Sequence, residues 1–297
     1  MITARAEVSE AVADQVEALG CEAEPTSFPW SVIQPRPEDP WMLQGYFNTP
    51  EAARAGFALL RTQIDGLPAT ATYQELPDQA WQDAYKLHLK PWACGRLQWV
   101  PAWDPDPAEL TQTDDTVRVI LDSGMAFGTG SHETTRLCAR RLVDWADSPA
   151  FDPKATVIDA GCGSGVLALS ALALGVESVF AFDNDPEAVR IAAENADING
   201  LASRCTCAVH GLDDGLTGRQ ADLLLANIQT PILNPHAETL LQALAPGGRL
   251  VLSGILTKEG EALRQRYEQT CQALYQENGY VDSRTDGEWC DLVFQRP

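Results

Sequence analysis

Three alternating glycines, Gly161, Gly163 and Gly165, constrain the fold of this chain more than any other feature. They follow an apolar stretch at residues 157–158 and precede another that begins at Val166, so they predict a turn between a buried strand and a helix. Glycine has no Cβ, and the backbone can therefore turn tightly and come close to a ligand. Such a ligand would meet the free N–H groups at the start of the helix. We expect a ligand-binding loop here.

Strand-like and helix-like patterns alternate from residue 111 onward. Predicted strands cover residues 117–121, 156–159, 178–182, 204–209, 222–226 and 249–252, and two more follow Gly279. Predicted helices cover residues 136–146, 166–174, 186–199, 231–244 and 259–275. Repeated strand–helix units predict an α/β fold with a doubly wound, mainly parallel sheet. Ligands of such sheets bind outside the carboxyl ends of the strands, where the glycine loop lies.

The sequence pattern divides the chain into three zones. Residues 1–72 predict a small N-terminal α/β domain, residues 73–110 a connector, and residues 111–297 the large α/β domain. The N-terminal zone contains a helix pattern over residues 8–19 that Gly20 would end, a strand over 41–47, and a helix over 50–64 with Thr49 as its N-cap. The connector carries four of the eight tryptophans, and we expect their rings to pack.

The glycine spacing discriminates between ligands. A dinucleotide fingerprint is G-x-G-x-x-G, whereas here the spacing is G-x-G-x-G and Val166 stands where the last glycine would fall. Asp159 precedes the first glycine, and Asp183 ends the next predicted strand, where a carboxylate can accept hydrogen bonds from ribose hydroxyls. This combination favours a nucleoside-type cofactor over a nicotinamide dinucleotide. A structural turn followed by a helix cap is the alternative.

Two further elements point to the same edge of the predicted sheet. Asn227 follows the strand over 222–226, and its amide oxygen could accept a hydrogen bond from an amine and orient it. Alternatively, Asn227 is only a turn former. The segment 124–135 offers backbone N–H groups, hydroxyls, the aromatic ring of Phe127 and the imidazole of His132. Its structural alternative is that Thr134 or Thr135 caps the following helix.

Charge and cysteine content restrict the partners and the compartment. The chain has 42 acidic and 21 basic residues, a formal net charge of −21. Such a surface repels phosphate backbones and anionic headgroups, so we expect neither nucleic acid nor membrane as a direct partner. A small molecule or a basic protein suits it. No apolar run reaches the ~20 residues that span a bilayer, and the eight cysteines form no C-x-x-C pair. We expect a reduced, cytoplasmic protein without a structural metal.

Several sequence strings resemble the PrmA family of class I methyltransferases. They are GMAFGTGSHETTRLC, VIDAGCGSGVLALSALALG, FDNDPEAV, LLLANI, LSGIL and the terminal GEWC. The resemblance implies a seven-stranded Rossmann-like domain, S-adenosyl-L-methionine as cofactor, and an N-terminal substrate-recognition domain. It also implies methylation of amines, on lysine side chains and at the N-terminus, of a basic large-subunit ribosomal protein, either free before assembly or on the ribosome.

The resemblance also implies roles for individual residues. Cofactor contacts fall on Thr135, Gly161, Asp183 and Asn227, with Gly163 from the same loop. Phe127 and residues 128–130 would close over the methyl donor, and Asn227 is the expected catalytic residue. The chain departs from the family at Gln229 and Thr230, where an aliphatic or small residue and then alanine are usual. This departure keeps open a different protein lysine or a small amine as acceptor, and a non-catalytic cofactor-binding module is a third hypothesis.

Overall fold

The computed structural model describes residues 2–22, 29–34, 40–47, 49–75, 90–122 and 132–297. The chain forms two compact units, Met1–Ala84 and Tyr85–Pro297. The division between them falls inside the connector expected at residues 73–110. Within that connector, residues 73–75 belong to a strand of the first unit, and residues 92–101 contribute two strands to the second unit.

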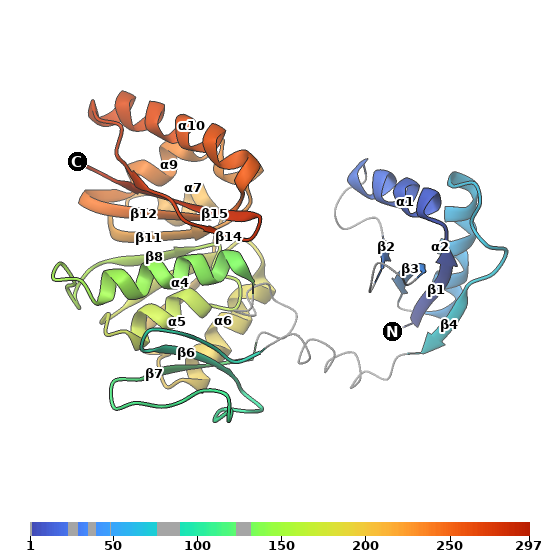
Figure 1. Cartoon of the computed structure of the whole chain (residues 1–297), viewed down its shortest axis with the longest axis horizontal. Helices are drawn as coiled ribbons and strands as arrows, with labels where there is room; N and C mark the ends of the chain where they lie inside the picture. Colours follow the sequence, from blue (N-terminus) through green and yellow to red (C-terminus); the bar gives the residue numbers. More distant parts are fainter. Residues whose placement is uncertain (1, 23–28, 35–39, 48, 76–89, 123–131) are drawn as a thin grey trace. The chain divides into compact units, whose positions relative to one another are not determined.

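The first unit is a four-stranded antiparallel sheet with two helices (Figure 1). In chain order its elements are β1 (Ile2–Val8), α1 (Glu10–Glu22), β2 (Trp30–Ile33), β3 (Trp41–Phe47), α2 (Pro50–Gln63) and β4 (Thr72–Glu75). The strands lie in the order β2-β3-β1-β4. Inward side chains of the sheet and of both helices form one core, which includes Trp30, Leu43 and Phe57. The predicted cap of α2 is confirmed, because Thr49 Oγ1 accepts a hydrogen bond from Ala52 N at 3.1 Å.

The helix predicted over residues 8–19 is wrong at both ends. Val8 is the last residue of β1, and Gly20 lies within α1 rather than ending it. The sequence hides β1 because two of its inward positions are Ala4 and Ala6, both buried. Alanine favours helices and is depleted in strands, so the period-2 pattern of this strand is weak. Of the four strands in the sheet of the first unit, the sequence predicted only β3, and it revealed neither β1 nor the short strands β2 and β4.

A mixed sheet forms the centre of the second unit. Its strands are β8 (Val157–Ala160), β9 (Val179–Asp183), β10 (Cys205–Val209), β11 (Ala221–Asn227), β12 (Leu244–Leu256), β13 (Tyr280–Asp282), β14 (Thr285–Asp286) and β15 (Trp289–Gln295). The order is β10-β9-β8-β11-β12-β15-β13, and β14 pairs with β15. The pairs from β10 to β12 are parallel, whereas β15 is antiparallel to β12 and β13. β8 and β11 are neighbours at the point where the winding reverses, which is where such folds bind ligands.

Helices cover both faces of this sheet (Figure 1). One core contains residues of α4 (Glu133–Ala146), α5 (Val166–Ala173) and α6 (Pro186–Ile198). The other contains residues of α7 (Leu212–Leu216), α8 (Thr230–Leu233), α9 (Ala237–Gln242) and α10 (Thr257–Tyr275). Successive strand residues alternate between the cores: Leu223 and Leu225 lie in the first, Leu224 in the second. The doubly wound α/β architecture predicted from the sequence is confirmed.

A small sheet packs beside α5. It consists of β5 (Trp92–Cys94), β6 (Leu97–Pro101) and β7 (Val117–Leu121), in the order β5-β6-β7. Trp99 is 1% exposed, its indole N–H donates to Ser170 Oγ at 2.8 Å, and its ring lies 4.4 Å from that of Trp92. These two connector tryptophans are packing residues, as expected. Trp103 is partly exposed, and Trp81 lies outside the described residues.

The single helix predicted over residues 231–244 is wrong. The chain forms α8, then α9, and Leu244 already belongs to β12. Pro235 lies between the two short helices, and proline interrupts a helix because it lacks the N–H group and its ring clashes with the preceding turn. None of the helices in the described part of the chain has the length and apolarity to cross a membrane. The described residues also contain no group of three or more His, Cys, Asp or Glu side chains that could hold a metal ion.

Candidate active site

The glycine loop joins β8 to α5 in a conformation that favours glycine. Gly161, Gly163 and Gly165 have φ angles of 69°, 52° and 80°, all in the left-handed region. The N–H groups of Gly161 and Cys162 both donate to Phe182 O, at 2.8 and 3.0 Å, so the loop is held against the end of β9. A Cβ on Gly161 would lie 2.9 Å from Ile228 Cγ1. The loop therefore also packs closely against the residue that follows β11.

Asp183 is fixed against this loop by its carboxylate. Oδ2 accepts a hydrogen bond from Gly163 N at 2.9 Å, and Oδ1 accepts one from Asp185 N at 3.0 Å. An ionised carboxylate has about four acceptor sites, so Asp183 can still accept hydrogen bonds from hydroxyl groups. The structure thus places the predicted ribose-binding carboxylate directly beside the predicted cofactor loop.

Asp159 stabilises the start of α5 from the end of β8. Gly165, the N-cap residue of α5, has no side chain that could accept a hydrogen bond, and Asp159 Oδ2 instead accepts one from Ala168 N at 2.9 Å. The Asp159 side chain is 1% exposed. Burial, reinforced by the negative charge of Asp183, raises the pKa of Asp159 to about 7. A cationic group bound near this carboxylate would favour its ionised form.

Asn227 and Thr135 meet at the end of β11. The Asn227 amide donates from Nδ2 to Thr135 Oγ1 at 3.2 Å, and Thr135 is buried in the first turn of α4. The other amide atom, Asn227 Oδ1, is buried and has no hydrogen-bond partner among the described residues. An unsatisfied buried acceptor costs about 1–3 kcal/mol. The geometry of Asn227 therefore suits a ligand that brings an N–H or O–H donor to this oxygen.

The start of α4 is capped by a histidine, and the threonine cap offered as a structural alternative is wrong. Neither Thr134 nor Thr135 caps the helix, because His132 is the N-cap residue and its Nδ1 accepts from Thr134 N at 3.3 Å. The imidazole lies 5.1 Å from the Trp289 ring in an edge-to-face contact. The role of His132 that the structure shows is thus to cap α4 and to hold its first turn near β15.

Two residues beside the site were not singled out individually from the sequence. Ser253, fully buried on β12, donates from Oγ to Thr134 O at 2.9 Å and accepts from Ile228 N through its carbonyl at 3.0 Å. Trp289 contacts His132 as described above. Both lie in strings that carried the family resemblance, LSGIL and GEWC, but no spacing rule marked them. Of the predicted site residues, Phe127 and residues 128–130 lie outside the described residues.

The predicted residues that the structure does describe come together at one edge of the sheet. Gly161, Gly163 and Asp183 are linked by hydrogen bonds of the loop, and Asn227 is bonded to Thr135. Because Ile228 packs on Gly161, these two groups are neighbours. We call these five residues the strand-end site, since they lie at or beside the carboxyl ends of β8, β9 and β11.

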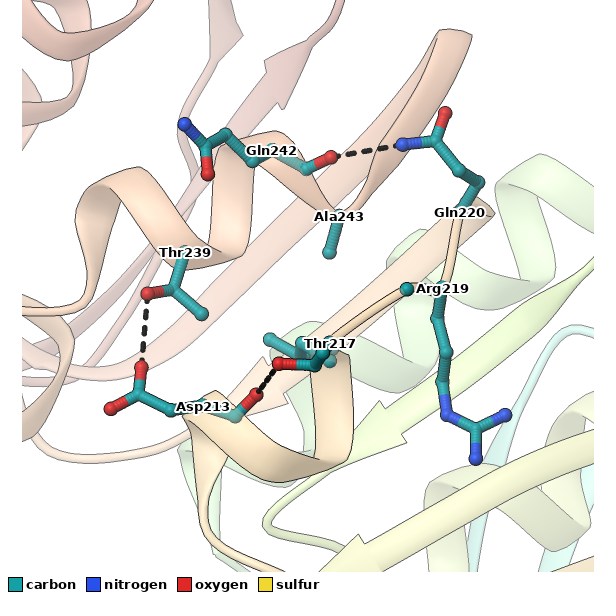
Figure 2. Close-up of a pocket in the computed structure, with 9 residues that line it drawn as sticks. Asp213, Thr217, Arg219, Gln220, Thr239, Gln242 and Ala243 are labelled. Carbon is teal, nitrogen blue, oxygen red and sulfur yellow. Dashed lines mark hydrogen bonds between the residues drawn. The ribbon is translucent and has the colours of Figure 1, made fainter.

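A separate hollow lies between α7 and α9 (Figure 2). It has a volume of about 460 Å³, and Asp213, Thr217, Arg219, Gln220, Thr239 and Gln242 are among the residues that line it. Thr239 Oγ1 donates to Asp213 Oδ1 at 3.0 Å, and Gln220 Nε2 donates to Gln242 O at 3.0 Å. The Arg219 guanidinium stacks on the Phe180 ring at 3.7 Å. None of the predicted site residues lines this hollow.

Comparison with known proteins decides the family. The model of the ribosomal protein L11 methyltransferase family, PrmA, matches residues 1–297. The chain belongs to this family. A ribosomal protein L11 methyltransferase of Pelobacter propionicus is 37% identical over 266 residues, which cover 86% of this chain and 81% of that protein. A counterpart from Xanthomonas campestris is 37% identical over 220 residues, covering 73% of this chain and 70% of that protein.

A solved structure supports the PrmA assignment. The crystal structure of a ribosomal protein L11 methylase from Lactobacillus delbrueckii subsp. bulgaricus superposes with a TM-score of 0.56 at 30% identity. It covers 68% of this chain and 95% of that protein. The family resemblance read from the sequence, the fold class, the methyltransferase activity and the cofactor S-adenosylmethionine are therefore confirmed.

Proposed function

We propose that this enzyme transfers methyl groups from S-adenosylmethionine to amines of ribosomal protein L11, on lysine side chains and at the N-terminus. The observation that carries this proposal is the unsatisfied amide oxygen of Asn227 beside the glycine loop. An acceptor amine has N–H donors that could satisfy this oxygen. Because the Asn227 amide nitrogen is already bonded to Thr135, the side chain is held in one orientation.

The strand-end site fits the cofactor in shape and in charge. Left-handed glycines at 161 and 163 remove side chains that would block a close approach of the adenosyl group. The Asp183 carboxylate can accept from the two ribose hydroxyls, and Asp159 and Asp183 together provide negative charge for a cation. When bound, S-adenosylmethionine supplies an electrophilic methyl group on a cationic sulfur. Thr135 holds Asn227, and we assign closure over the methyl donor to Phe127.

The acceptor must lose a proton before it can react. A free lysine amine has a pKa of ~10.4, so most of it is protonated at neutral pH, and desolvation at the site would lower that pKa. We assign deprotonation to water and alignment of the amine to Asn227 Oδ1 and the Ile228 carbonyl. Gly254 keeps room for this carbonyl, since a Cβ at that position would lie 2.7 Å from Ile228 O. Alignment at near-attack distance is the main contribution that the protein makes.

The charge of the chain supports a basic protein as substrate. A formal charge of −21 attracts a lysine-rich protein and speeds its association, whereas ribosomal RNA would be repelled. We therefore propose that free L11, before assembly, is a better substrate than L11 on the ribosome. The seven described cysteines are free thiols, which suits a reducing compartment such as the cytoplasm. We assign substrate recognition to the domain at residues 1–72, joined by residues 73–110 to the catalytic domain at 111–297.

A transfer assay tests the proposal directly. The enzyme would be incubated with methyl-labelled S-adenosylmethionine and either free L11, intact ribosomes or the other ribosomal proteins, with Asn227→Ala as control. We expect label in free L11, on amines identified by mass spectrometry, and little with the control. Label only in another protein or a small amine would instead favour the alternative acceptor suggested by Gln229 and Thr230. Cofactor binding without transfer to any amine would indicate a non-catalytic module.

A further inference from the structure

Two asparagines one turn apart, Asn195 in α6 and Asn199 at its C-cap, bind the open edge of β7. Asn199 contacts a single residue of the strand: Ile120 N donates to Asn199 Oδ1 at 2.8 Å, and Asn199 Nδ2 donates to Ile120 O at 2.7 Å. Asn195 contacts two separate segments. Asp122 N donates to Asn195 Oδ1 at 2.9 Å, and Asn195 Nδ2 donates to Ser164 O at 2.9 Å. Of these two asparagines, Asn195 alone links the end of β7 to the glycine loop.

The surroundings of Asn195 make these bonds costly to lose. Asn195 and Ser164 are both fully buried, and a buried amide left without partners costs about 1–3 kcal/mol. Ser164 lies between Gly163 and Gly165, whose left-handed φ angles of 52° and 80° define the loop. Gly163 in turn donates its N–H group to Asp183. Asn195 thus holds the Ser164 carbonyl in the middle of the most glycine-rich sequence of the site.

We infer that Asn195 is a positioning residue for cofactor binding, which holds the glycine loop at Ser164 and the end of β7 at Asp122 in one arrangement. The inference rests on the proposed placement of the cofactor at the strand-end site. If the loop must be in this arrangement to bind the cofactor, binding must also stabilise the Asp122–Asn195 hydrogen bond, because coupling between two sites is reciprocal. Asn199 offers a matched control, since it binds the same strand from the C-cap of α6 and does not bond to the loop. Its Nδ2 also donates to Asn195 O at 2.7 Å, a backbone atom that substitutions at position 195 keep.

The first test compares Asn195→Asp with Asn199→Asp. Each aspartate keeps an oxygen for the backbone N–H but loses the amide donor and turns a carboxylate oxygen toward a carbonyl. We expect Asn195→Asp to weaken binding of S-adenosylhomocysteine about tenfold or more in calorimetry, which is a loss of ~1.4 kcal/mol or more. The KM for S-adenosylmethionine should rise similarly while kcat changes little. Asn199→Asp should lower the melting temperature but leave affinity within about twofold.

The second test measures the reciprocal effect. Hydrogen–deuterium exchange of the peptide covering residues 117–122 should slow when S-adenosylhomocysteine is added to the wild-type enzyme or to Asn199→Ala. In Asn195→Ala this ligand-dependent slowing should be lost, even if the peptide exchanges faster overall. Because each readout is a ligand-dependent difference in a folded variant, a general loss of stability does not imitate it. Circular dichroism would show which variants are folded. If one variant of a pair fails to fold, the other pair, alanine in place of aspartate or the reverse, is used in both tests.

Three outcomes would overturn the inference. Unchanged affinity in both Asn195 variants would show that the link to Ser164 does not matter for binding. Equal losses of affinity in the Asn195 and Asn199 variants would show a purely structural role. If Asp183→Ala also leaves affinity unchanged, the placement of the cofactor at the strand-end site has failed and the inference falls with it. If Asp183→Ala weakens binding but the Asn195 variants do not, the inference alone is wrong.

Discussion

Two polar clusters of the second unit, the strand-end site and the hollow between α7 and α9, differ in how their hydrogen bonds are satisfied. In the hollow, Asp213, Thr239 and Gln220 bind one another or nearby carbonyls (Figure 2). At the strand-end site, Asn227 Oδ1 has no partner among the described residues, and it lies at the end of a buried strand. Both clusters are rich in polar side chains, but of the two only the strand-end site contains a buried side-chain atom without a hydrogen-bond partner among the described residues.

Polar side chains alone do not mark a functional site in this molecule. A hollow whose groups are already paired would gain little by binding a polar ligand, since each new hydrogen bond would replace an existing one. A fixed, unpaired acceptor gains a full hydrogen bond when its ligand arrives. The buried Asp159 beside the strand-end site agrees with this distinction, because a buried carboxylate is costly to a fold that does not use it. Variants at the strand-end site should therefore change activity or cofactor affinity, whereas variants in the hollow should change only stability.

The largest effect is expected for Asn227→Ala. Removing the amide leaves only the Ile228 carbonyl to orient the acceptor amine, and misplacement of a reacting group by about 1 Å can cost ~100-fold in rate. We expect kcat with L11 to fall at least about 100-fold while the circular dichroism spectrum stays near that of the wild type. Steady-state assays with labelled cofactor measure this. Near-normal turnover would remove Asn227 from the mechanism.

The next largest effect is expected for Asp183→Ala. A hydrogen bond to a charged group contributes about 1.5–3 kcal/mol, so the dissociation constant of the cofactor should rise between about tenfold and 100-fold in calorimetry. Asp185→Ala is the matched control, because Asp185 caps α6 next to the site by accepting from Glu187 N at 2.9 Å. That control should lower stability without changing affinity. A similar loss of affinity in both variants would mean that Asp183 acts only through the local fold.

The sequence predicted the strand-end site better than it predicted the elements around it. Glycine spacing, the position of Asp183 and the strand end at Asn227 are local signals, and the structure brings these residues together. They were predictable because parallel strands place their carboxyl ends at one edge of a sheet. The family resemblance added Thr135, whose contact with Asn227 spans 92 residues of sequence. No periodicity could have indicated that contact.

The failures of the sequence interpretation also have physical causes. β1 escaped detection because two of its buried positions are alanine, and tertiary packing overrides the helix propensity of that residue. The predicted helix over residues 231–244 runs through Pro235 because the residues on both sides have a helical pattern. In the structure this proline separates α8 from α9, since it cannot continue a helix. The threonine cap of α4, offered as a structural alternative because hydroxyls are common caps, is wrong, since the imidazole of His132 takes that position.

A smaller effect should come from the titration of Asp159. Its pKa is raised to about 7, mainly by burial, so the side chain is mostly protonated at pH 6 and mostly ionised at pH 8. A cationic cofactor favours the ionised form, and its affinity should therefore rise with pH across this range, by at most about tenfold if binding requires the carboxylate. Calorimetry at pH 6, 7 and 8 measures the slope. Asp159→Asn cannot ionise and should flatten it, whereas a slope that persists in this variant must come from another group.

The smallest effect is expected in the hollow, and it tests the other half of the comparison. In Thr239→Val, the valine has nearly the same shape as threonine but cannot donate the hydrogen bond to Asp213. Since this bond is exposed, its loss should lower the free energy of unfolding by about 1 kcal/mol or less, measurable by urea denaturation. Both kcat and cofactor affinity should stay at wild-type values, because no ligand needs this hydroxyl. A fall in either quantity with unchanged stability would show that the hollow takes part in catalysis, and satisfied hydrogen bonds would then no longer distinguish a structural cluster from a functional one.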